Sequence, residues 1–467
     1  YIDIQFNNIL NIAGIDVFIF LLFMSTKYMN QYLYNKNDKR EKMIRRTVLT
    51  VAIVIYMAFS IIWTLNVECI VEGDQIPVLE TATALYHDNV EEVLQHDTYA
   101  GVSIGRYLET NQQQIPLACM YSVFLKIMHT DQAEMLRIIN IISNVLIVLA
   151  LYKITTQLAK DYPVNKAFMF TLILTFVSIP MLSTFIYGDI PSLALCLWAV
   201  YLIMKYRENR KIRYIISAAI LNMIACMMRM NSLIFVIATV MYLLFTLLEK
   251  NNLWKEKVLS IMMIIVYLVI CLVPSSLVKS HFLEKYHLDK DKAFSSSNYL
   301  LMAMVGSRRS NGWYNESIGE YTLKNPEAAN EEHKAQLKER INYFLQHPGQ
   351  AIGFYVVKLA STWTENTYSA VRNNMKEYED PLQKIADPVS FYQKALLIVM
   401  CLCSLVVLIQ NRKNLSLEVL FLVTIFIGGF AFHILWETKS RYIIPYIVVL
   451  MPVASIAIQK STRKQIN

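Results

Sequence analysis

Acidic side chains occupy short turns between long apolar segments. Asp74 lies in a Glu-Gly-Asp-Gln stretch that follows one apolar segment, and Asp189 lies in a tight Tyr-Gly-Asp-Ile-Pro turn between two others. Charges near a lipid–water boundary are costly to desolvate, and perturbed carboxylates of this kind often serve acid–base chemistry. A single acid at a helix end is more often a cap or a solvated turn. We nevertheless select Asp74 and Asp189 as candidate catalytic residues because basic groups occupy similar turns.

These basic groups are arginines. Arg229 opens one turn, and Arg441 lies with Glu437 in the turn before the last apolar segment. Guanidinium groups bind phosphate through charge-assisted and often bidentate hydrogen bonds. Together with the two aspartates they form an acid–base and anion-binding set. Further candidates for phosphate binding or support are Gln75, Arg106, Asn231, Arg308 and Arg309.

A metal site has weaker support. His433 and Glu437 are four residues apart, so they can share one face of a helix. A divalent ion would need at least one further ligand, and a histidine near a helix end is more often simply hydrogen-bonded. We therefore retain a divalent metal as a possible cofactor, with these two residues as weak candidate ligands, and predict no other cofactor.

The composition indicates the elements that must position these groups. Of the 467 residues, 55% are hydrophobic and only 17% are charged, whereas soluble proteins have about 25% charged residues. The apolar runs are too continuous for barrel strands, so we expect membrane-spanning helices. The sequence predicts an all-α polytopic membrane protein with about eleven transmembrane helices and extracytoplasmic loop helices. The expected spans cover approximately residues 9–26, 47–66, 133–152, 166–185, 190–206, 213–229, 231–249, 257–277, 391–410, 415–434 and 442–459.

Lysine and arginine set the expected orientation. The connections 27–46 and 205–213 and the tail are rich in basic residues, which favour the cytoplasmic side. Residues 67–114 hold nine acidic residues and one basic residue, so we expect this loop outside. The candidate acids and arginines then share the extracytoplasmic side. Because the net charge of +8 is explained by these loops, we expect no nucleic-acid partner.

Two short apolar runs, 115–128 and 351–362, would upset this orientation if they crossed the membrane. We therefore expect both to be re-entrant or interfacial helices on the outer side. Residues 77–95 have helical spacing, and 295–298 and 310–313 resemble turns. The expected division is 1–46 (an extra span and a basic loop), 47–277 (a transmembrane core with the outer loop 67–132), 278–390 (an extracytoplasmic loop region) and 391–467 (C-terminal transmembrane helices).

The order of these motifs resembles that of the GT-C membrane glycosyltransferases. Asp74 opens a long outer loop, which closes on Tyr-Leu-Glu-Thr-Asn-Gln-Gln-Gln-Ile-Pro at residues 107–116 before a short apolar helix. The Tyr-Gly-Asp hairpin, an Arg-Met-Asn-Ser stretch beginning at Arg229 and the final Glu-to-Arg-Tyr turn follow in that order. The resemblance covers most of residues 47–459 and is strongest to the branch of protein O-mannosyltransferases and aminoarabinose transferases.

This resemblance implies a GT-C fold, a catalytic Asp74, a supporting Asp189 and a sugar donor linked to polyprenyl phosphate. Three features depart from the pattern. Gln75 stands where the mannosyltransferase branch has a second acid, Pro116 stands where a proline pair is common, and the expected span 9–26 precedes the usual first helix.

A lipid-linked donor also suits the expected location, because cytosolic nucleotide sugars do not reach an outer site. Asp74 would take the proton of an acceptor hydroxyl, and the sugar would be transferred with inversion. The leaving phosphate would be held by Arg441 with help from Arg229, Arg308 or Arg309, while Asp189 and Glu437 would orient these groups or hold the acceptor. The acceptor is a glycan, a lipid or a protein, and the sequence does not identify the sugar.

Other membrane functions remain as alternatives. A transporter or lipid flippase usually has ionisable groups near the bilayer midplane and internal repeats, and neither stands out here. Another lipid-dependent transferase or a non-enzymatic assembly partner also remains open. Because high Ile, Lys and Asn contents are typical of low-GC bacteria, we expect a multi-pass protein of a bacterial plasma membrane.

Overall fold

The computed structural model describes residues 38–67, 71–98, 100–162, 164–248, 254–365, 367–371 and 383–456, and no strand occurs among them. The expected span 9–26 lies outside these residues. The all-α fold class is confirmed, because eight of the described helical segments are long and apolar enough to cross a membrane. Their main helices are α2 (Asp38–Asn66), α7 (Arg137–Leu158), α8 (Lys166–Thr175), α10 (Asp189–Asn209), α12 (Leu233–Leu247), α13 (Trp254–Lys285), α18 (Gln383–Gln410) and α19 (Leu417–Leu435).

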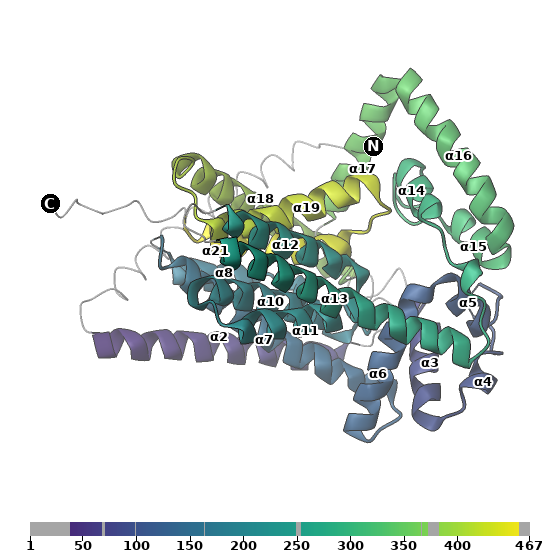
Figure 1. The fold of residues 1–467 in the computed structure, drawn as a ribbon, viewed down its shortest axis with the longest axis horizontal. Coiled ribbons are helices and arrows are strands. Elements are labelled where there is room, and N and C mark those ends of the chain that lie inside the picture. The colour runs from purple at the N-terminus through teal and green to yellow at the C-terminus, as the bar shows by residue number, and fades with distance from the viewer. Residues whose placement is uncertain are drawn as a thin grey trace.

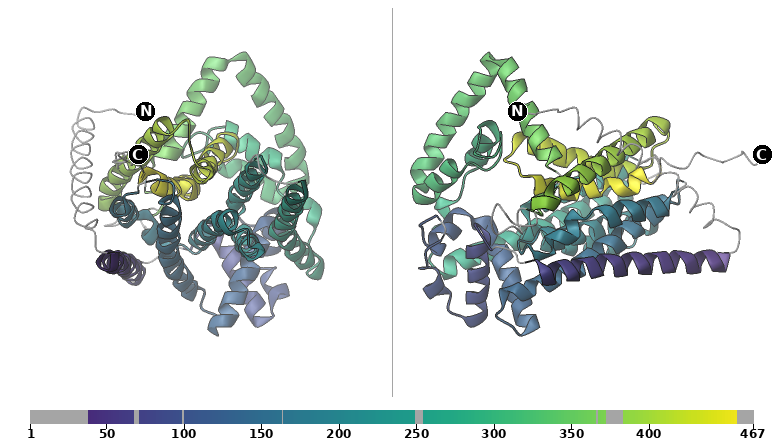
Figure 2. Two further views of the ribbon diagram at one scale, coloured as in Figure 1. Left: turned by 60° about the vertical axis from the view of Figure 1, so that its left-hand side comes forward. Right: turned by 180° about the vertical axis from the view of Figure 1, so that it is seen from behind.

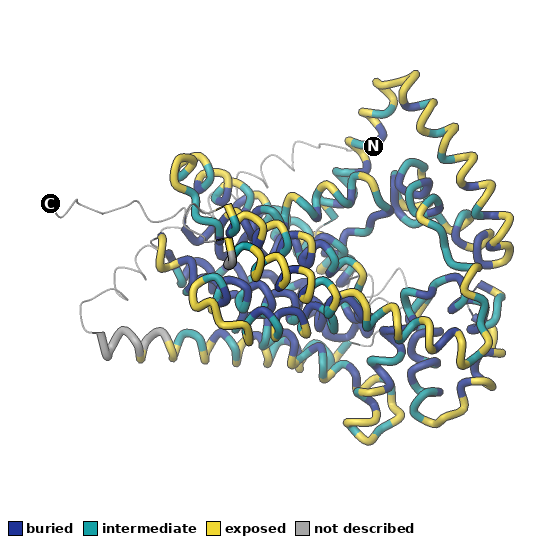
Figure 3. Tube along the Cα trace, in the orientation of Figure 1, coloured by how far each residue is buried: buried dark blue, intermediate teal, exposed yellow. Residues whose placement is uncertain are grey.

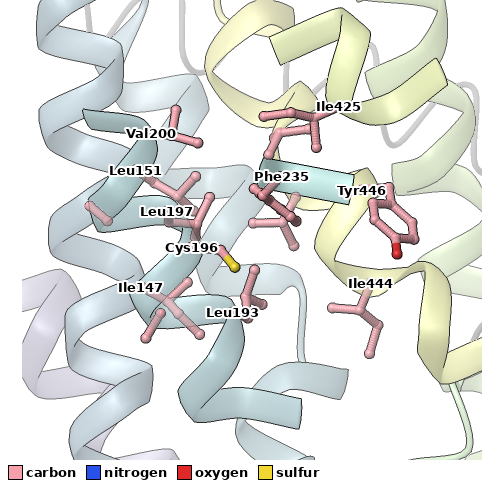
Figure 4. Packing of buried hydrophobic residues seen from close by; sticks show 14 of the residues in the cluster. Ile147, Leu151, Leu193, Cys196, Leu197, Val200, Phe235, Ile425, Ile444 and Tyr446 are labelled. Atoms are coloured by element: carbon pink, nitrogen blue, oxygen red, sulfur yellow. The ribbon is translucent and has the colours of Figure 1, made fainter. Parts of the chain in front are cut away.

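These helices lie side by side in one elongated bundle (Figures 1 and 2). α10 lies inside it, between α7 and the shorter apolar helix α11 (Ile212–Met228). Side chains from α7, α10, α12, α19 and the C-terminal segment meet in a common apolar core (Figure 4). Close packing of this kind fixes the positions of the helices relative to one another, and the candidate residues lie at the helix ends.

The last expected span differs from the sequence-based expectation. Instead of one helix over 442–459, the described part divides into η7 (Ser440–Ile443), α20 (Ile444–Val448) and α21 (Leu450–Ala454). Pro445 and Pro452 lie in the two short α-helices, and proline removes a backbone donor and clashes with the preceding turn. The count of eleven spans is therefore not confirmed. α2 also begins at Asp38, within a stretch expected to be a loop.

One group of short helices covers an end of the bundle (Figure 1). It contains α3 (Gln75–His87), α4 (Val90–Val93), α5 (Ile104–Thr110), η1 (Gln112–Gln114) and α6 (Ile115–Met128). These helices share a second apolar core with Phe282 and Leu283 near the end of α13. The helix expected over 77–95 begins earlier and breaks at Asp88, whose φ of 58° is left-handed.

A second group lies at the same end and contains α14 (Ser296–Met304), α15 (Glu316–Lys324), α16 (Pro326–Gln346) and α17 (Pro348–Thr364). The expected turn at 295–298 is instead the start of α14. The turn expected at 310–313 is confirmed, because Gly306 and Asn311 form a bridge and Gly312 has a φ of 71°. Exposed residues predominate along α16, whereas the bundle interior is buried (Figure 3).

Candidate functional site

Asp74 is held by two tyrosines from different parts of the chain. It precedes α3 and follows Gly73, whose φ of +56° turns the chain into that helix. The Tyr107 hydroxyl donates to Oδ1 of Asp74 at 2.8 Å, and the Tyr187 hydroxyl donates to Oδ2 at 3.1 Å. Both tyrosines are buried. The carboxylate therefore has a fixed orientation that links α3, α5 and the hairpin before α10.

Tyr187 connects this carboxylate to the rest of the site. Gln114 of η1 donates to its hydroxyl oxygen at 2.6 Å. Burial and the nearby Asp74 carboxylate raise the pKa of Tyr187, so its hydroxyl keeps the proton that it donates. The next residue, Gly188, has a φ of +79°, and a side chain there would lie 3.1 Å from the backbone oxygen of Met228. Glycine is thus required for the turn that presents Tyr187 and Asp189.

Asp189 lies between two arginines that come from distant segments. Its Oδ1 is 3.4 Å from Nε of Arg229 and 3.9 Å from Nε of Arg441. The guanidinium carbon of Arg229 lies 4.6 Å from the centre of the Tyr187 ring, and that of Arg441 lies 4.4 Å from the centre of the Phe185 ring. Two guanidinium groups thus share one carboxylate and rest on aromatic faces, and such groups can also donate hydrogen bonds to an anion.

A narrow cleft adjoins this group. It lies between the first turns of α10, the start of α12 and the C-terminal segment. Its polar lining comes from Asp189, Ser192, Arg229, Asn231, Ser232, Arg441 and Tyr442, and the remaining lining is mostly apolar. Asn231 is therefore where the sequence predicted it, beside the arginines. The lining therefore combines cationic groups with apolar side chains.

Glu437 approaches the same centre from the turn after α19. Its side chain is buried, and this burial raises the pKa of the carboxyl group, an effect that Lys439 and Arg441 oppose. Burial also raises the pKa values of Tyr299 and Tyr314, and the carboxylates of Asp74 and Glu437 both add to these shifts. Both acids therefore lie close enough to the two tyrosines to influence their pKa values.

Lys358 of α17 fixes the position of this turn. Its ammonium group is fully buried and donates to the carbonyl oxygens of Ala303, Ile434 and Trp436 at 2.9–3.0 Å. Burial lowers the pKa of Lys358 to about 8, and the Glu437 carboxylate opposes that shift. We did not identify Lys358 from the sequence, although a lone lysine inside the apolar run 351–362 was the available signal.

Several predicted residues lie elsewhere. Arg106 pairs with Glu109 at 3.2 Å, and Glu109 also meets Lys292 at 3.5 Å. Arg308 and Arg309 are exposed on the turn between α14 and α15. The structure therefore does not bring these three arginines into the buried cluster. Gln75 differs from them, because it is buried beside Asp74 and its amide points at the carbonyl of Ile186, 3.5 Å away.

His433 is buried among aromatic rings. Its ring centre lies 5.7 Å from that of Tyr446 and 6.0 Å from that of Tyr442. Within the described part of the chain, no three His, Cys, Asp or Glu side chains form a group that could hold a metal ion. Among the described residues, His433 and Glu437 therefore have no third protein ligand beside them. The ring contacts of His433 are those of a member of an aromatic cluster.

The tyrosines are the residues that sequence reasoning missed. Tyr107 and Tyr187 stood inside the quoted motifs without an assigned role, and Tyr299 and Tyr314 were not selected at all. The chain has 28 tyrosines, and their spacing does not mark these four. Only the folded arrangement shows that they face the same carboxylates.

Comparison with known proteins supports the resemblance proposed from the motifs. Residues 115–276 match a family described as dolichyl-phosphate-mannose-protein mannosyltransferase. The matched part contains Asp189 and Arg229 and excludes Asp74 and Arg441. The resemblance to GT-C membrane glycosyltransferases is thereby confirmed. No curated protein matches the chain.

Two solved structures of an archaeal oligosaccharyltransferase are also similar. The first is AglB from Archaeoglobus fulgidus in complex with an inhibitory peptide and a dolichol-phosphate; it is 14% identical, with a TM-score of 0.47 over 90% of this chain and 50% of that one. The second is the apo form of the Archaeoglobus fulgidus oligosaccharyltransferase, 14% identical, with a TM-score of 0.46 over 88% and 50% of the chains. This chain spans about half the length of both.

Proposed function

We propose that this GT-C-type membrane glycosyltransferase moves a sugar from a polyprenyl-phosphate donor to an acceptor hydroxyl on the extracytoplasmic side. One observation carries the proposal: Asp74, Asp189, Arg229, Glu437 and Arg441 come from separate segments and meet at one end of a bundle of apolar helices. A general base, an anion-binding pair and an apolar boundary are the parts that such a transfer needs.

In the proposed reaction Asp74 is the general base. The acceptor oxygen attacks the anomeric carbon while its proton moves to the Asp74 carboxylate. The bond between the anomeric carbon and the phosphate oxygen breaks, and its electron pair leaves with polyprenyl phosphate. A single displacement inverts the anomeric centre, because no protein nucleophile intervenes. The hydrogen bonds from Tyr107 and Tyr187 orient the base for this step.

Arg229 and Arg441 bind the leaving phosphate in this proposal. Negative charge grows on the phosphate as the bond breaks, and preorganised guanidinium groups stabilise that charge most strongly away from water. Asp189 holds both arginines near each other, and the walls of the adjoining narrow cleft are mostly apolar. Glu437 completes the polar surroundings and contacts the acceptor or the sugar.

The test uses the purified full-length protein in lipid nanodiscs. Defined polyprenyl-phosphate sugars are supplied with candidate glycan, lipid and peptide acceptors, and release of polyprenyl phosphate is measured. We expect release with at least one donor, and we expect Asp74→Asn to lower its rate by about 10²–10⁴-fold, the usual contribution of a general base.

Glu72→Gln is the matched control, because Glu72 is an exposed acid two residues before Asp74. Its release rate should equal that of the wild type. Retention of the wild-type rate by Asp74→Asn would remove Asp74 from the mechanism. Failure of every lipid-linked donor would remove the proposed reaction as well.

A further inference from the structure

α17 presents an outward face without a charged side chain. Ile352, Val356 and Val357 on this face are 66%, 55% and 45% exposed. Gly349 and Gly353 lie on the same side of the helix and are also exposed. The opposite face packs inward through Phe354 and Lys358, so α17 is apolar on the side that meets no other described part of the chain.

The preceding helix has the opposite character. The exposed residues of α16 include Glu327, Glu331, Glu332, Lys334, Lys338 and Glu339. The elbow between the helices is fixed, because the Arg340 guanidinium lies 4.3 Å from the centre of the Phe344 ring and 5.6 Å from that of Phe354. One helix of this pair therefore suits water, and the other suits an apolar medium.

Lys358 fixes the position of α17 along the long axis of the bundle. Its ammonium group binds the carbonyls of Ile434 and Trp436, which flank the last residue of the candidate span α19. That last residue, Leu435, is 64% exposed. Figure 1 shows α17 running across the direction of the bundle helices at this end. α17 thus lies where an apolar span meets the polar region beyond it.

We propose that α17 is an interfacial helix that lays Ile352, Val356 and Val357 on the surface of the lipid bilayer. Lipid is the favoured partner because α13, α18 and α19 expose aliphatic side chains in the same way, and α17 continues that surface at the end of α19. A face of three large side chains is also small beside the roughly 800 Å² per partner of a standard protein interface. This inference does not depend on the proposed sugar transfer.

The experiment places a dye on the full-length protein in vesicles of phosphatidylethanolamine and phosphatidylglycerol. Para-azidophenylalanine replaces Val356, or Ile352 in a second variant, and carries an environment-sensitive dye. Lys338 of α16 is the matched control position. Lipids with a nitroxide near the top of the acyl chain should quench the dye at 352 and 356 at least about two-fold more than at 338.

Two results would overturn the proposal. A dye at 356 that aqueous iodide quenches, but lipid nitroxide does not, would place the helix in water. A dye shielded from both quenchers would show that another protein or a second copy covers this face. The two positions on α17 guard against a local effect of the label, and variants that are not monodisperse after purification are replaced by labels at Gly349 or Gly353.

Discussion

The two ends of α10 show how the same kinds of side chain can form either a structural ion pair or a candidate binding site. Asp189 is the first residue of this helix, and Arg207 lies in its last turn. Eighteen residues separate them, which corresponds to about 27 Å along the helix. Both residues form ion pairs that are mostly buried, but the pairs differ in how completely their charges are matched.

At the Arg207 end, one acid meets one base. The Arg207 guanidinium lies 2.5 Å from Oε1 of Glu418, and the Tyr242 hydroxyl donates to the same oxygen at 3.2 Å. These three groups join α10, α12 and α19. The charge of Arg207 balances that of Glu418, and the contacts are short. We therefore interpret this cluster as one that holds the three helices together.

At the Asp189 end, two arginines meet one carboxylate at longer distances, 3.4 and 3.9 Å. Their planes rest on tyrosine and phenylalanine rings, and a cleft opens beside them. Among the direct contacts around Asp189, the guanidinium groups outnumber the carboxylate, so these arginines can also bind an anionic ligand. We therefore expect substitutions at the first end to reduce stability and substitutions at the second end to reduce activity.

The largest effect on stability should come from Arg207→Met. This change leaves the Glu418 carboxylate buried without its cationic partner, and breaking a buried pair in this way costs about 3 kcal/mol. The free energy of unfolding, measured by denaturant titration in detergent micelles, should fall by that amount. Turnover per folded molecule should stay at the wild-type level.

Two further variants make this test specific. Arg213→Met removes an exposed arginine near the same end and should change stability by less than about 0.5 kcal/mol. Arg207→Met combined with Glu418→Leu removes both charges and should recover most of the loss. A wild-type unfolding free energy in Arg207→Met alone would show that the ion pair with Glu418 does not stabilise the fold.

Arg441→Gln should produce the complementary result. It removes one of two cations beside Asp189, and the lost charge-assisted contact to phosphate should lower kcat/KM by about 100-fold. Because Arg229 still pairs with Asp189, we expect the unfolding free energy to stay within about 1 kcal/mol of the wild type. Arg412→Gln, at an exposed position between α18 and α19, is the control for loss of an arginine. A large loss of stability in Arg441→Gln would show that charged contacts at both ends of α10 stabilise the fold.

The sequence predicted the group at the Asp189 end of α10 but not the ion pair at the Arg207 end. Short turns between apolar runs, read with the distribution of lysine and arginine, identified Asp74, Asp189, Arg229, Glu437 and Arg441 as one group. The structure brings all five together. This prediction was possible because a membrane restricts helices to two sets of ends, so topology alone brings distant turns to the same side.

What the sequence could not predict depends on packing. Arg106 satisfies the same charge rule but pairs with Glu109 on α5, because local helix spacing favours that contact. Lys358 lies within the apolar run 351–362, and three backbone carbonyls accept its hydrogen bonds. Which partner a charged group meets depends on side-chain contacts between helices, and these leave no periodic signal in the sequence.

Tyr187 offers the finest test, because it contacts both parts of the site. Tyr187→Phe removes the hydroxyl that donates to Asp74 but keeps the ring beneath Arg229, so kcat should fall by about 10-fold while KM for the donor is unchanged. Tyr187→Leu also removes the aromatic face and should raise KM, since Arg229 loses a contact that holds its plane. Tyr107→Phe is the comparison, because Tyr107 donates to the other oxygen of the same carboxylate. Steady-state kinetics on the three variants would separate orientation of the base from support of the arginines. Equal effects of Tyr187→Phe and Tyr187→Leu on KM would mean that the Tyr187 ring does not support phosphate binding, and Arg229 would then be held by Asp189 and the Tyr442 ring.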